Sequence, residues 1–360
     1  MPSQNVISKI IIPAMNIGKF IQYDAQGFVH NKSQYLMAGM AAISMAKRIR
    51  EVLPEWYFGG LTEQQAQPYL NKITWREVME IAVKWRQISE PNDPIFWIDQ
   101  LTHEQFEEGF GSHTAMFIGQ TRVVRYYSQY HRAFRLLQKY MVKQIPMRDE
   151  WKERVTKANS MEEIFEMFPD NFHVTTDCQS THFTDEKGNK KVYEGTRLIV
   201  EKENPGFQFA IKTPCTKKRW ELFDKELTEC WKRIVLLVLT RKGKEGEEEP
   251  MMRAMFDFAF YWYNFMPLSR GTAACGFVFM MALLASLDLQ INRYLKKDIQ
   301  IDWEAILCDD PKKFEDVMFG WMKNSLAQFD LESVPDFDKE IKTPREIIKC
   351  FNYCPNVNCD

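Results

Sequence analysis

Hydrophobic residues recur at three- and four-residue intervals along much of the chain, which is the spacing of one face of an α-helix. The segment 33–53 follows this spacing and carries basic residues near its end, where the helix dipole favours them. The segment 74–89 opens with Thr74 and Glu77 in a capping-box arrangement and stops before the breaker sequence EPNDP. Residues 114–145 continue the helical spacing. We predict a helix in each of these segments.

The pattern changes between residues 172 and 213, where Thr, Val and Phe alternate with polar positions. The sequence EKGNK separates two such runs, and NPG separates the second run from FQFAIKT. Alternation with a period of two, interrupted by turns that contain glycine, is typical of antiparallel hairpins. We therefore predict a small antiparallel sheet, or flap, inserted among the helices.

Helical spacing returns in the segment 215–240, where Thr216 is a candidate N-cap. The sequence FMPLSRG then leads into Thr272–Leu287, a run of sixteen positions without a charged residue. This run is shorter than the roughly 20 residues that cross a bilayer, and a helix that is apolar on every side is typical of a protein core. We expect a mainly α fold, a multi-helix bundle around this buried central helix with a small antiparallel β flap.

The chain has 360 residues, of which 45% are hydrophobic and 27% are charged, and this composition suits one large or two modest domains. We expect residues 1–70 to form a helical N-terminal extension. Residues 71–345 should form the main helical domain, with the β insertion at 172–213. The remaining residues, 346–360, are expected to form an irregular tail that contains cysteines.

The net charge of −2 provides no general attraction to nucleic acid or to anionic membranes. The eight cysteines are scattered rather than arranged as a disulfide framework, which favours a reducing compartment. The N-terminal residues lack a basic segment followed by a long apolar one, so we expect no secretory signal. These features indicate a cytoplasmic protein, with the nucleus as the alternative, that binds no nucleic acid and has no membrane span.

The turn before the apolar helix carries Ser269, Arg270, Gly271 and Thr272. A helix N-terminus offers unpaired N–H groups and a partial positive charge, so a guanidinium, two hydroxyls and a glycine at that place are suited to holding a phosphate or carboxylate. The alternative is an ordinary helix start, with Ser269 as the N-cap and Arg270 on the surface or paired with an acidic neighbour. The sequence leaves both interpretations open.

Further candidates lie elsewhere in the chain. His113 follows a segment rich in Gly and Ser, at the expected start of the 114–145 helix, and is a candidate acid or base at a pocket rim; a loop histidine bonded to backbone is the alternative. Arg122 and Arg125 have the spacing to point the same way toward an anion, and Arg197 in the flap is a third candidate. Solvated basic faces are the alternative for all three arginines.

No metal site and no cofactor are expected. His173 and His182 flank Asp177 and Cys178, but these residues lack the close paired spacing of a zinc motif. No phosphate loop, dinucleotide fingerprint or nucleophile elbow occurs in the sequence. The cysteines of the tail have no histidine nearby, and we interpret them as free thiols: Cys350, Cys354 and Cys359.

Several long strings closely resemble the C-terminal region of the tetratricopeptide repeat protein 13 family: AVKWRQISEPNDPIFWIDQL, KTPCTKKRWELFDKEL, YWYNFMPLSRGTAACGF and IDWEAIL. A plant suppressor of immune-receptor signalling is built in the same way. The resemblance runs from Ile73 to Trp321 and implies a scaffold or repressor role. In this family, tandem repeats of about 34 residues precede the region, and residues 1–70 are too few for such a stack, so roles that depend on the repeats are not carried over.

A remoter similarity concerns Fic-type (Fido) nucleotide transferases, which place a flap hairpin, a proline-led helix and a helix–loop–helix in this order. Pro267 and Gly271 match the loop motif of those enzymes. Met266 stands where the general-base histidine is expected, Arg270 where the metal-binding carboxylate is expected, and Ala274 where a phosphate-binding arginine is expected. A thioether takes up no proton and a cation repels Mg²⁺, so the resemblance implies that the usual transfer is lost and an anion pocket remains.

Two hypotheses about function follow. The first is a non-catalytic regulatory or protein-interaction domain that binds a protein partner and has an anion or nucleotide pocket at the 269–272 turn. The alternative is a divergent Fic-like group transferase for nucleotidyl or phosphoryl transfer, in which His113 acts as acid or base and Arg270 and Arg197 bind a phosphate-containing small molecule. The alternative requires His113 and Arg270 to line one cleft.

Overall fold

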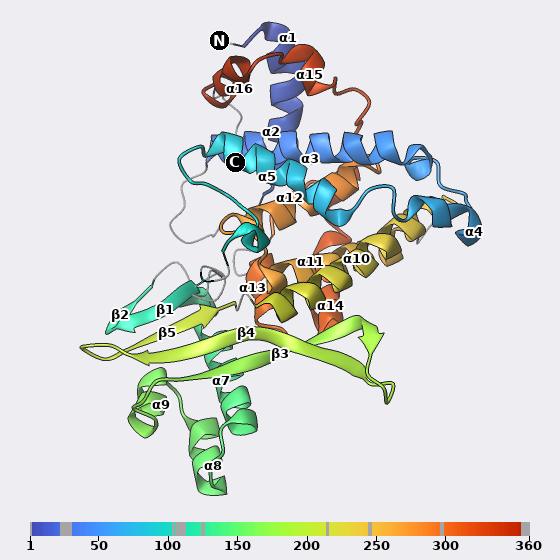
Figure 1. Ribbon diagram of the computed structural model, residues 1–360. Coiled ribbons are helices and arrows are strands. Elements are labelled where there is room, and N and C mark those ends of the chain that lie inside the picture. Colours follow the sequence, from blue (N-terminus) through green and yellow to red (C-terminus); the bar gives the residue numbers. More distant parts are fainter. Residues whose placement is uncertain are drawn as a thin grey trace.

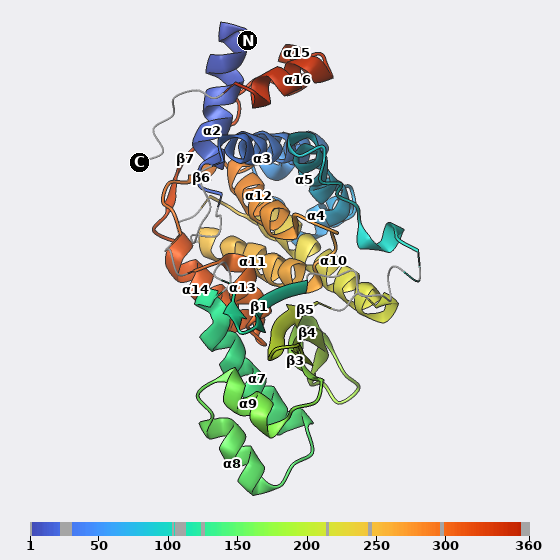
Figure 2. The ribbon, with the colours of Figure 1, turned by 90° about the vertical axis from the view of Figure 1, so that its left-hand side faces the viewer.

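A computed structural model describes residues 2–21, 31–102, 104, 113–123, 127–213, 216–243, 247–295 and 299–353. Helices dominate this part of the chain, and a five-stranded antiparallel sheet packs against them (Figure 1). Seen from the side, the molecule is elongated, with the terminal helices at one end, the central helices and the sheet in the middle, and α8 at the other end (Figure 2). The predicted mainly α fold with a small antiparallel sheet is confirmed.

The helical elements before the sheet are α1 (Gln4–Val6), η1 (Ile7–Ile11), α2 (Ile12–Gly18), α3 (Lys32–Val52), η2 (Pro54–Trp56), α4 (Glu63–Ala66), η3 (Gln67–Tyr69), α5 (Trp75–Ser89) and η4 (Ile98–Gln100). Those that follow are η5 (Tyr127–Gln129), α7 (Tyr130–Gln144), α8 (Asp149–Lys157), α9 (Met161–Met167), α10 (Lys217–Thr240), α11 (Glu248–Phe265), α12 (Thr272–Ala285), α13 (Ile301–Ile306), α14 (Pro311–Met322), α15 (Phe337–Glu340) and α16 (Pro344–Phe351). The predicted helices at 33–53, 74–89 and 215–240 are confirmed as α3, α5 and α10. The predicted caps are also present, because Thr74 and Glu77 form a capping box and Thr216 accepts a hydrogen bond from the Arg219 amide.

The N-terminal helices pack directly against the rest of the helical core. α2 crosses α3 at a pair of glycines, and the two backbones touch there. A Cβ atom at Gly39 would lie 1.8 Å from the carbonyl oxygen of Ala14, and one at Gly18 would lie 1.8 Å from that of Tyr35. α3 packs in turn against α5 and α12, so the N-terminal segment contributes to the same core as the central helix.

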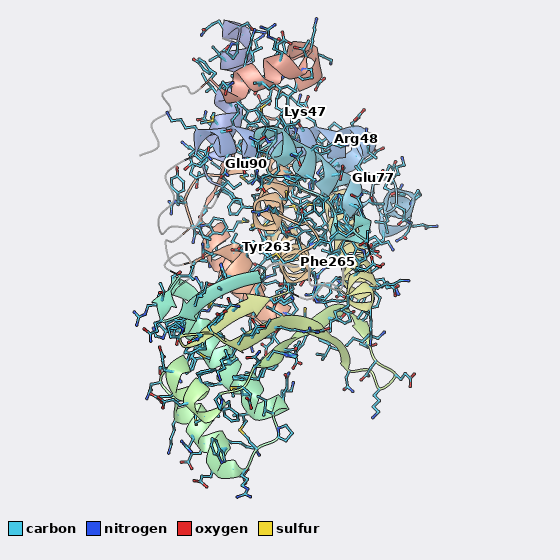
Figure 3. The ribbon with its side chains drawn as sticks, turned by 60° about the vertical axis from the view of Figure 1, so that its left-hand side comes forward. Lys47, Arg48, Glu77, Glu90, Tyr263 and Phe265 are labelled. Carbon is cyan, nitrogen blue, oxygen red and sulfur yellow. The ribbon has the colours of Figure 1, made fainter. Side chains whose placement is uncertain are left out.

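α12 is the central helix. All of its residues except Ala273 and Ala274 are buried, as its uncharged sequence predicts, and it packs against α3, α5 and α11. A Cβ atom at Gly276 would lie 2.6 Å from the ring of Trp262 and 2.8 Å from that of Tyr263. Large aromatic side chains of α11 therefore lie directly on the backbone of α12, and Figure 3 shows Tyr263 in the middle of the molecule.

The sheet has the strand order β2-β1-β5-β4-β3, and every neighbouring pair is antiparallel. Its strands are β1 (His113–Gly119), β2 (Thr121–Arg122), β3 (Phe172–Thr184), β4 (Lys190–Lys202) and β5 (Phe207–Lys212). The last three form the insertion predicted at 172–213. β3 buries every second residue between Val174 and Ser180, as the alternation of its sequence requires.

The prediction of one helix over residues 114–145 is wrong in its first half. Residues 113–119 form β1, which pairs with the edge of β5, and α7 begins only at Tyr130. The edge of β5 presents backbone N–H and C=O groups that need partners, and β1 supplies them. Met116 and Phe117 are buried against the sheet, and Gly119 ends the strand with a φ of 62°. Tertiary pairing thus overrides the local helical pattern.

A second hydrophobic core lies between the sheet and the three helices α7, α8 and α9 (Figure 1). Aromatic members from α7 and β5 include Phe134, Tyr140 and Phe209. Met266 and Trp303 enter this core from the helical part of the molecule. The two cores are therefore joined across the sheet.

The last described helices, α15 and α16, lie at the same end of the molecule as α1 (Figure 1). β6 (Leu289–Ile291) and β7 (Leu326–Gln328) form a two-stranded ribbon, and the side chain of Asn5 donates a hydrogen bond to Glu340 at 2.8 Å. α16 extends helical structure into the segment for which we expected an irregular tail, and it buries Cys350. Cys354 and Cys359 lie outside the described residues. Within the described part of the chain, none of the helices has the length and apolar character needed to cross a membrane.

Candidate functional site

The predicted anion-binding turn connects α11 to α12 in a tight, strained path. Met266 ends α11 with a φ of 51°, and Gly271 precedes α12 with a φ of 74°. Ser269 does not cap α12 with its side chain. Its amide donates to the carbonyl of Phe96 at 3.0 Å, and its hydroxyl accepts from the Phe96 amide at 3.1 Å. The turn is thereby tied to the extended segment that follows α5.

The cation of the turn has an acidic partner. The Arg270 side chain is 67% exposed, and its Nε lies 3.0 Å from a carboxylate oxygen of Asp93. Arg86 lies beneath Gly271 and pairs with Glu90 at 2.7 Å. This is the surface pairing that the alternative interpretation of the turn expects, and binding of an anion there stays a prediction.

Thr272 and a tryptophan cluster close the inner side of the turn. Thr272 is buried, and its carbonyl accepts a hydrogen bond from the indole N–H of Trp262 at 2.8 Å. Trp262 packs edge-on against Trp75 and Trp97, with ring centroids 6.3 Å and 6.1 Å away. Aromatic rings therefore fill the space behind the backbone of the turn.

The remaining predicted residues lie on the sheet. His113 does not stand beside a helix as expected; it begins β1 opposite Lys212, and Arg197 of β4 is opposite Lys212 on the other side. His113 and Arg197 are thus brought into one row across the sheet, whereas Arg270 pairs with Asp93 beside α5. Arg197 forms an ion pair with Glu194 at 2.7 Å. Arg122 is exposed in β2, and Arg125 lies outside the described residues.

Arg219 connects the flap to the end of α11. Its side chain is buried, and its Nε donates to the carbonyl of Glu194 in β4 at 3.0 Å. Its terminal nitrogens donate to the carbonyls of Asn264 and Phe265, the last residues of α11. The partial negative charge at a helix C-terminus suits a buried cation. The guanidinium lies over the ring of Phe223 at 4.3 Å.

A buried carboxylate that the sequence analysis did not single out holds β3 against α10. Glu226 is fully buried, and five donors from two strands surround its oxygens. They are the Ser180 hydroxyl at 2.9 Å, the Tyr193 hydroxyl at 2.9 Å, the amides of Thr181 at 2.8 Å and His182 at 3.0 Å, and Nδ1 of His182 at 3.2 Å. Burial raises the pKa of Glu226, but the hydrogen bonds from His182, Ser180 and Tyr193 outweigh it and leave the pKa below its ordinary value. Glu226 is therefore ionised at neutral pH.

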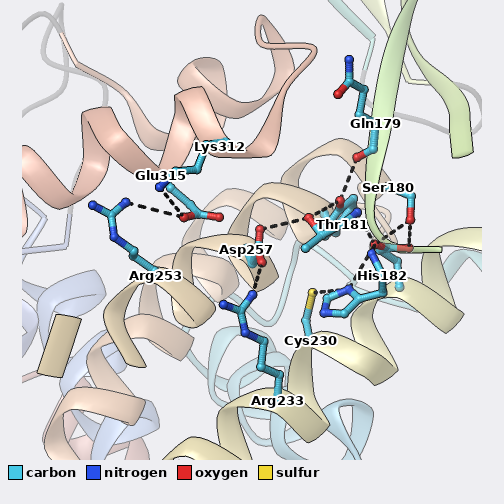
Figure 4. A network of polar contacts seen from close by, with 12 residues as sticks. Gln179, Ser180, Thr181, His182, Cys230, Arg233, Arg253, Asp257, Lys312 and Glu315 are labelled. Atoms are coloured by element: carbon cyan, nitrogen blue, oxygen red, sulfur yellow. Dashed lines mark hydrogen bonds and ion pairs between the residues drawn. The ribbon is translucent and has the colours of Figure 1, made fainter. Parts of the chain in front are cut away.

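A second buried carboxyl, Asp257, lies on α11 next to this group. It accepts hydrogen bonds from Arg233 at 2.9 Å and from the Thr181 hydroxyl at 3.2 Å (Figure 4). Burial raises the pKa of Asp257 to about 8, and the hydrogen bond and negative charge of Glu315 on α14 act in the same direction. The raised pKa favours the protonated form of Asp257, and β3, α11 and α14 meet at this carboxyl.

The Cys230 thiol beside this junction does not have the geometry of a nucleophile. Its Sγ lies 3.9 Å from Nδ1 of His182, the same nitrogen that faces Glu226. A catalytic histidine uses one ring nitrogen for the nucleophile and the other for the orienting acid. Burial raises the pKa of Cys230 well above its ordinary value, which suppresses the reactive thiolate.

The flap also keeps apart the residues around Asp177 and Cys178, where no metal site was expected. Cys178 is buried in β3, while its neighbour Asp177 faces outward and pairs with Lys143. Among the described residues, no group of three or more His, Cys, Asp or Glu side chains is placed to hold a metal ion. In the sequence, Glu226 is one of several acidic residues of the helical segment WELFDKELTEC, whereas Asp257 is an acidic residue inside the apolar run AMFDFAFYW.

The motif strings are explained by comparison with known proteins. Over 86% of its length, the chain is 33% identical to Suppressor of RPS4-RLD 1 from Arabidopsis thaliana. Over 88% of its length, it is 24% identical to tetratricopeptide repeat protein 13 from Homo sapiens. The chain spans about a third of each relative, 34% and 37% of their lengths. No protein-family model matches the chain. The resemblance expected from the strings is confirmed and covers most of the chain.

Proposed function

Because the chain is a homologue of Suppressor of RPS4-RLD 1 and of tetratricopeptide repeat protein 13 over most of its own length, we propose that it is a regulatory protein-interaction domain. This homology is the observation that carries the proposal. One relative is named as a suppressor and the other for its tetratricopeptide repeats, which stack to form extended binding surfaces. The chain matches a third of each protein, so the partners of the whole relatives are not assumed here.

The polar interior supports a role in holding the fold rather than in chemistry. Glu226 is saturated with donors from β3 and β4, and Asp257 is enclosed by Thr181, Arg233 and Glu315. A catalytic acid or base needs a proton path to a substrate. Glu226 and Asp257 instead form their hydrogen bonds with the surrounding protein groups. The junction instead provides a rigid frame between the helices and the sheet, which suits a domain that presents a surface to a partner.

We also propose that an anion bound at the 269–272 turn regulates the domain. An anion at Arg270 has to compete with Asp93, which already pairs with the guanidinium at 3.0 Å. The exposed position of Arg270 also leaves any added ion in contact with water, where such pairs contribute little. We therefore expect weak anion binding at this turn rather than a tight nucleotide site.

The experiment that tests the proposal uses the full chain. Crosslinking in cells followed by mass spectrometry should identify proteins held by the chain but not by an unrelated domain of similar size. Calorimetry with the purified partner should then show saturable binding with a fixed stoichiometry. A failure of every crosslinked protein to bind in purified form would contradict the proposal. Transfer of a nucleotide or phosphoryl group to the partner, detected as a mass increase, would contradict the non-catalytic role.

A further inference from the structure

The outer face of α7 forms one wall of an open groove. The groove has a volume of about 460 Å³ and is lined by His131, Arg132, Arg135, Leu136, Lys139 and Leu307. The opposite face of α7 is buried against the sheet, so the helix holds this wall rigidly. Leu307, directly after α13, is the lining residue on the other side.

The charges along this groove are not balanced. Arg132 pairs with Glu304 of α13, and Lys139 pairs with Asp309, which lies between α13 and α14. Arg135 lies between these pairs and is exposed, and its guanidinium donates to the neutral amide oxygen of Gln138 at 2.8 Å. Within the described residues, no carboxylate pairs with Arg135. The middle of the groove therefore carries a positive charge that a ligand can neutralise.

The floor of the groove is apolar. Leu136 is half-buried on α7, and Leu307 lies across from it at the end of α13. An extended chain with an acidic side chain next to an apolar one would match both the cation and the floor. A guanidinium binds a carboxylate through two parallel hydrogen bonds, which gives geometric selectivity as well as attraction.

We infer that this groove is a docking site for an acidic peptide segment of a partner protein, with a carboxylate on Arg135 and an apolar side chain on Leu136 and Leu307. This inference rests on the proposed interaction role and names the class of partner. Nucleic acid fits less well, because Arg132 and Lys139 are already paired with Glu304 and Asp309, so the groove offers no row of unpaired cations to a run of phosphates among the described residues.

Fluorescence anisotropy with labelled peptides tests this inference. The probe is a short peptide in which Glu alternates with Leu, and the comparison peptides replace Leu by Gly or Glu by Lys. The full chain is measured beside Arg135→Gln, which keeps an N–H donor for Gln138 but removes the charge. The matched control is Lys187→Gln, which makes the same change of charge at the exposed turn between β3 and β4.

We expect the Glu/Leu peptide to bind and Arg135→Gln to weaken its affinity about three- to fivefold, as loss of one solvent-exposed ion pair predicts. Lys187→Gln should leave the affinity within about twofold, and both comparison peptides should bind less tightly. Absent peptide binding, or equal affinity in Arg135→Gln, would overturn the inference. So would tighter binding of a labelled RNA oligonucleotide that Arg135→Gln weakens.

The same variants separate this inference from the proposed function. If a crosslinked partner binds Arg135→Gln and the unaltered chain equally, the groove is not its docking site while the interaction role stands. If no partner binds the chain at all, the interaction role itself fails, whatever the peptides do.

Discussion

Two polar regions lie along α11, and they use their side chains in different ways. The turn after α11 keeps its polar groups at the surface, where Ser269 bonds to backbone and the exposed Arg270 pairs with Asp93. The junction with β3, on the side of α11, encloses Glu226 and Asp257 completely, and most of their partners are other side chains or strand amides. The sequence of the turn resembles that of a binding site. The junction, in contrast, holds the helices and the sheet together.

The two carboxyls of the junction also differ from each other. Both are fully buried, yet the pKa of Glu226 is lowered and that of Asp257 is raised. Glu226 faces several donors, whereas Asp257 faces a second carboxyl in Glu315. Burial alone therefore does not decide the charge of an acid; the balance of donors and like charges around it does.

The largest expected effect on stability comes from removing the Glu226 carboxylate from the junction. Glu226→Ala should destabilise the protein by about 3–5 kcal/mol, because it leaves buried donors of β3 and β4 without an acceptor. Denaturant unfolding measures the change. Glu226→Gln is the matched variant and should lose less, because its amide oxygen still accepts. Equal stability of the alanine variant and the unaltered chain would show that β3 is not held by this carboxylate.

The next largest effect on stability tests how tightly α11 packs against α12. Gly276→Leu should cost about 2–3 kcal/mol, since its Cβ alone would lie 2.6 Å from the ring of Trp262. Gly320→Ala is the control, because a Cβ atom there meets nothing within 4 Å. Thermal unfolding of both variants provides the measurement. An unchanged melting temperature for Gly276→Leu would show that α11 and α12 are less tightly packed than described.

The pH dependence separates the two carboxyls. The pKa of Asp257 is about 8 in the folded protein, above its ordinary value of 3.8. Between these two pH values the folded protein therefore binds more protons at this group than the unfolded chain does. Its contribution to stability is present at low pH and is lost as the pH rises toward 8, with a slope of at most about 1.4 kcal/mol per pH unit. Asp257→Asn cannot titrate, so its unfolding free energy should fall less over this range.

Glu226 should show the opposite sign. Its folded-state pKa is lowered, so its contribution is present above the ordinary pKa and is lost as the pH falls through the lowered one. Glu226→Gln should therefore reduce the pH dependence only on the acid side. Parallel curves for the unaltered chain and both variants would show that the two carboxyls have the same charge state in the folded and unfolded protein.

The smallest effect belongs to the turn. Arg270→Ala should change the free energy of unfolding by no more than about 0.5–1 kcal/mol, because the pair with Asp93 is exposed to water. Any stabilisation by phosphate or nucleotide, measured as a rise in melting temperature, should disappear in this variant. Retained stabilisation by these anions would place their binding site somewhere other than the turn.

The sequence correctly predicted those parts of the fold that residues close together in the chain determine. The caps at Thr74 and Thr216 are signalled within one helical turn, and both are present. The hairpins of the 172–213 insertion are marked by EKGNK and NPG, and these two turns separate β3, β4 and β5. The candidate residues of the turn were placed at a helix start, but their partners Asp93 and Phe96 come from a distant segment that no local pattern connects to them.

The sequence by itself determined that α12 is buried, because sixteen positions without a charge leave no face that favours water. It also determined that residues 172–213 form strands, through alternation and turns. Only the tertiary structure decided that residues 113–119 pair as a strand, because the edge of β5 that they complete lies far along the chain. It also decided that the pKa of Glu226 is lowered and that of Asp257 raised, since a carboxyl group takes its pKa from the groups that folding brings around it.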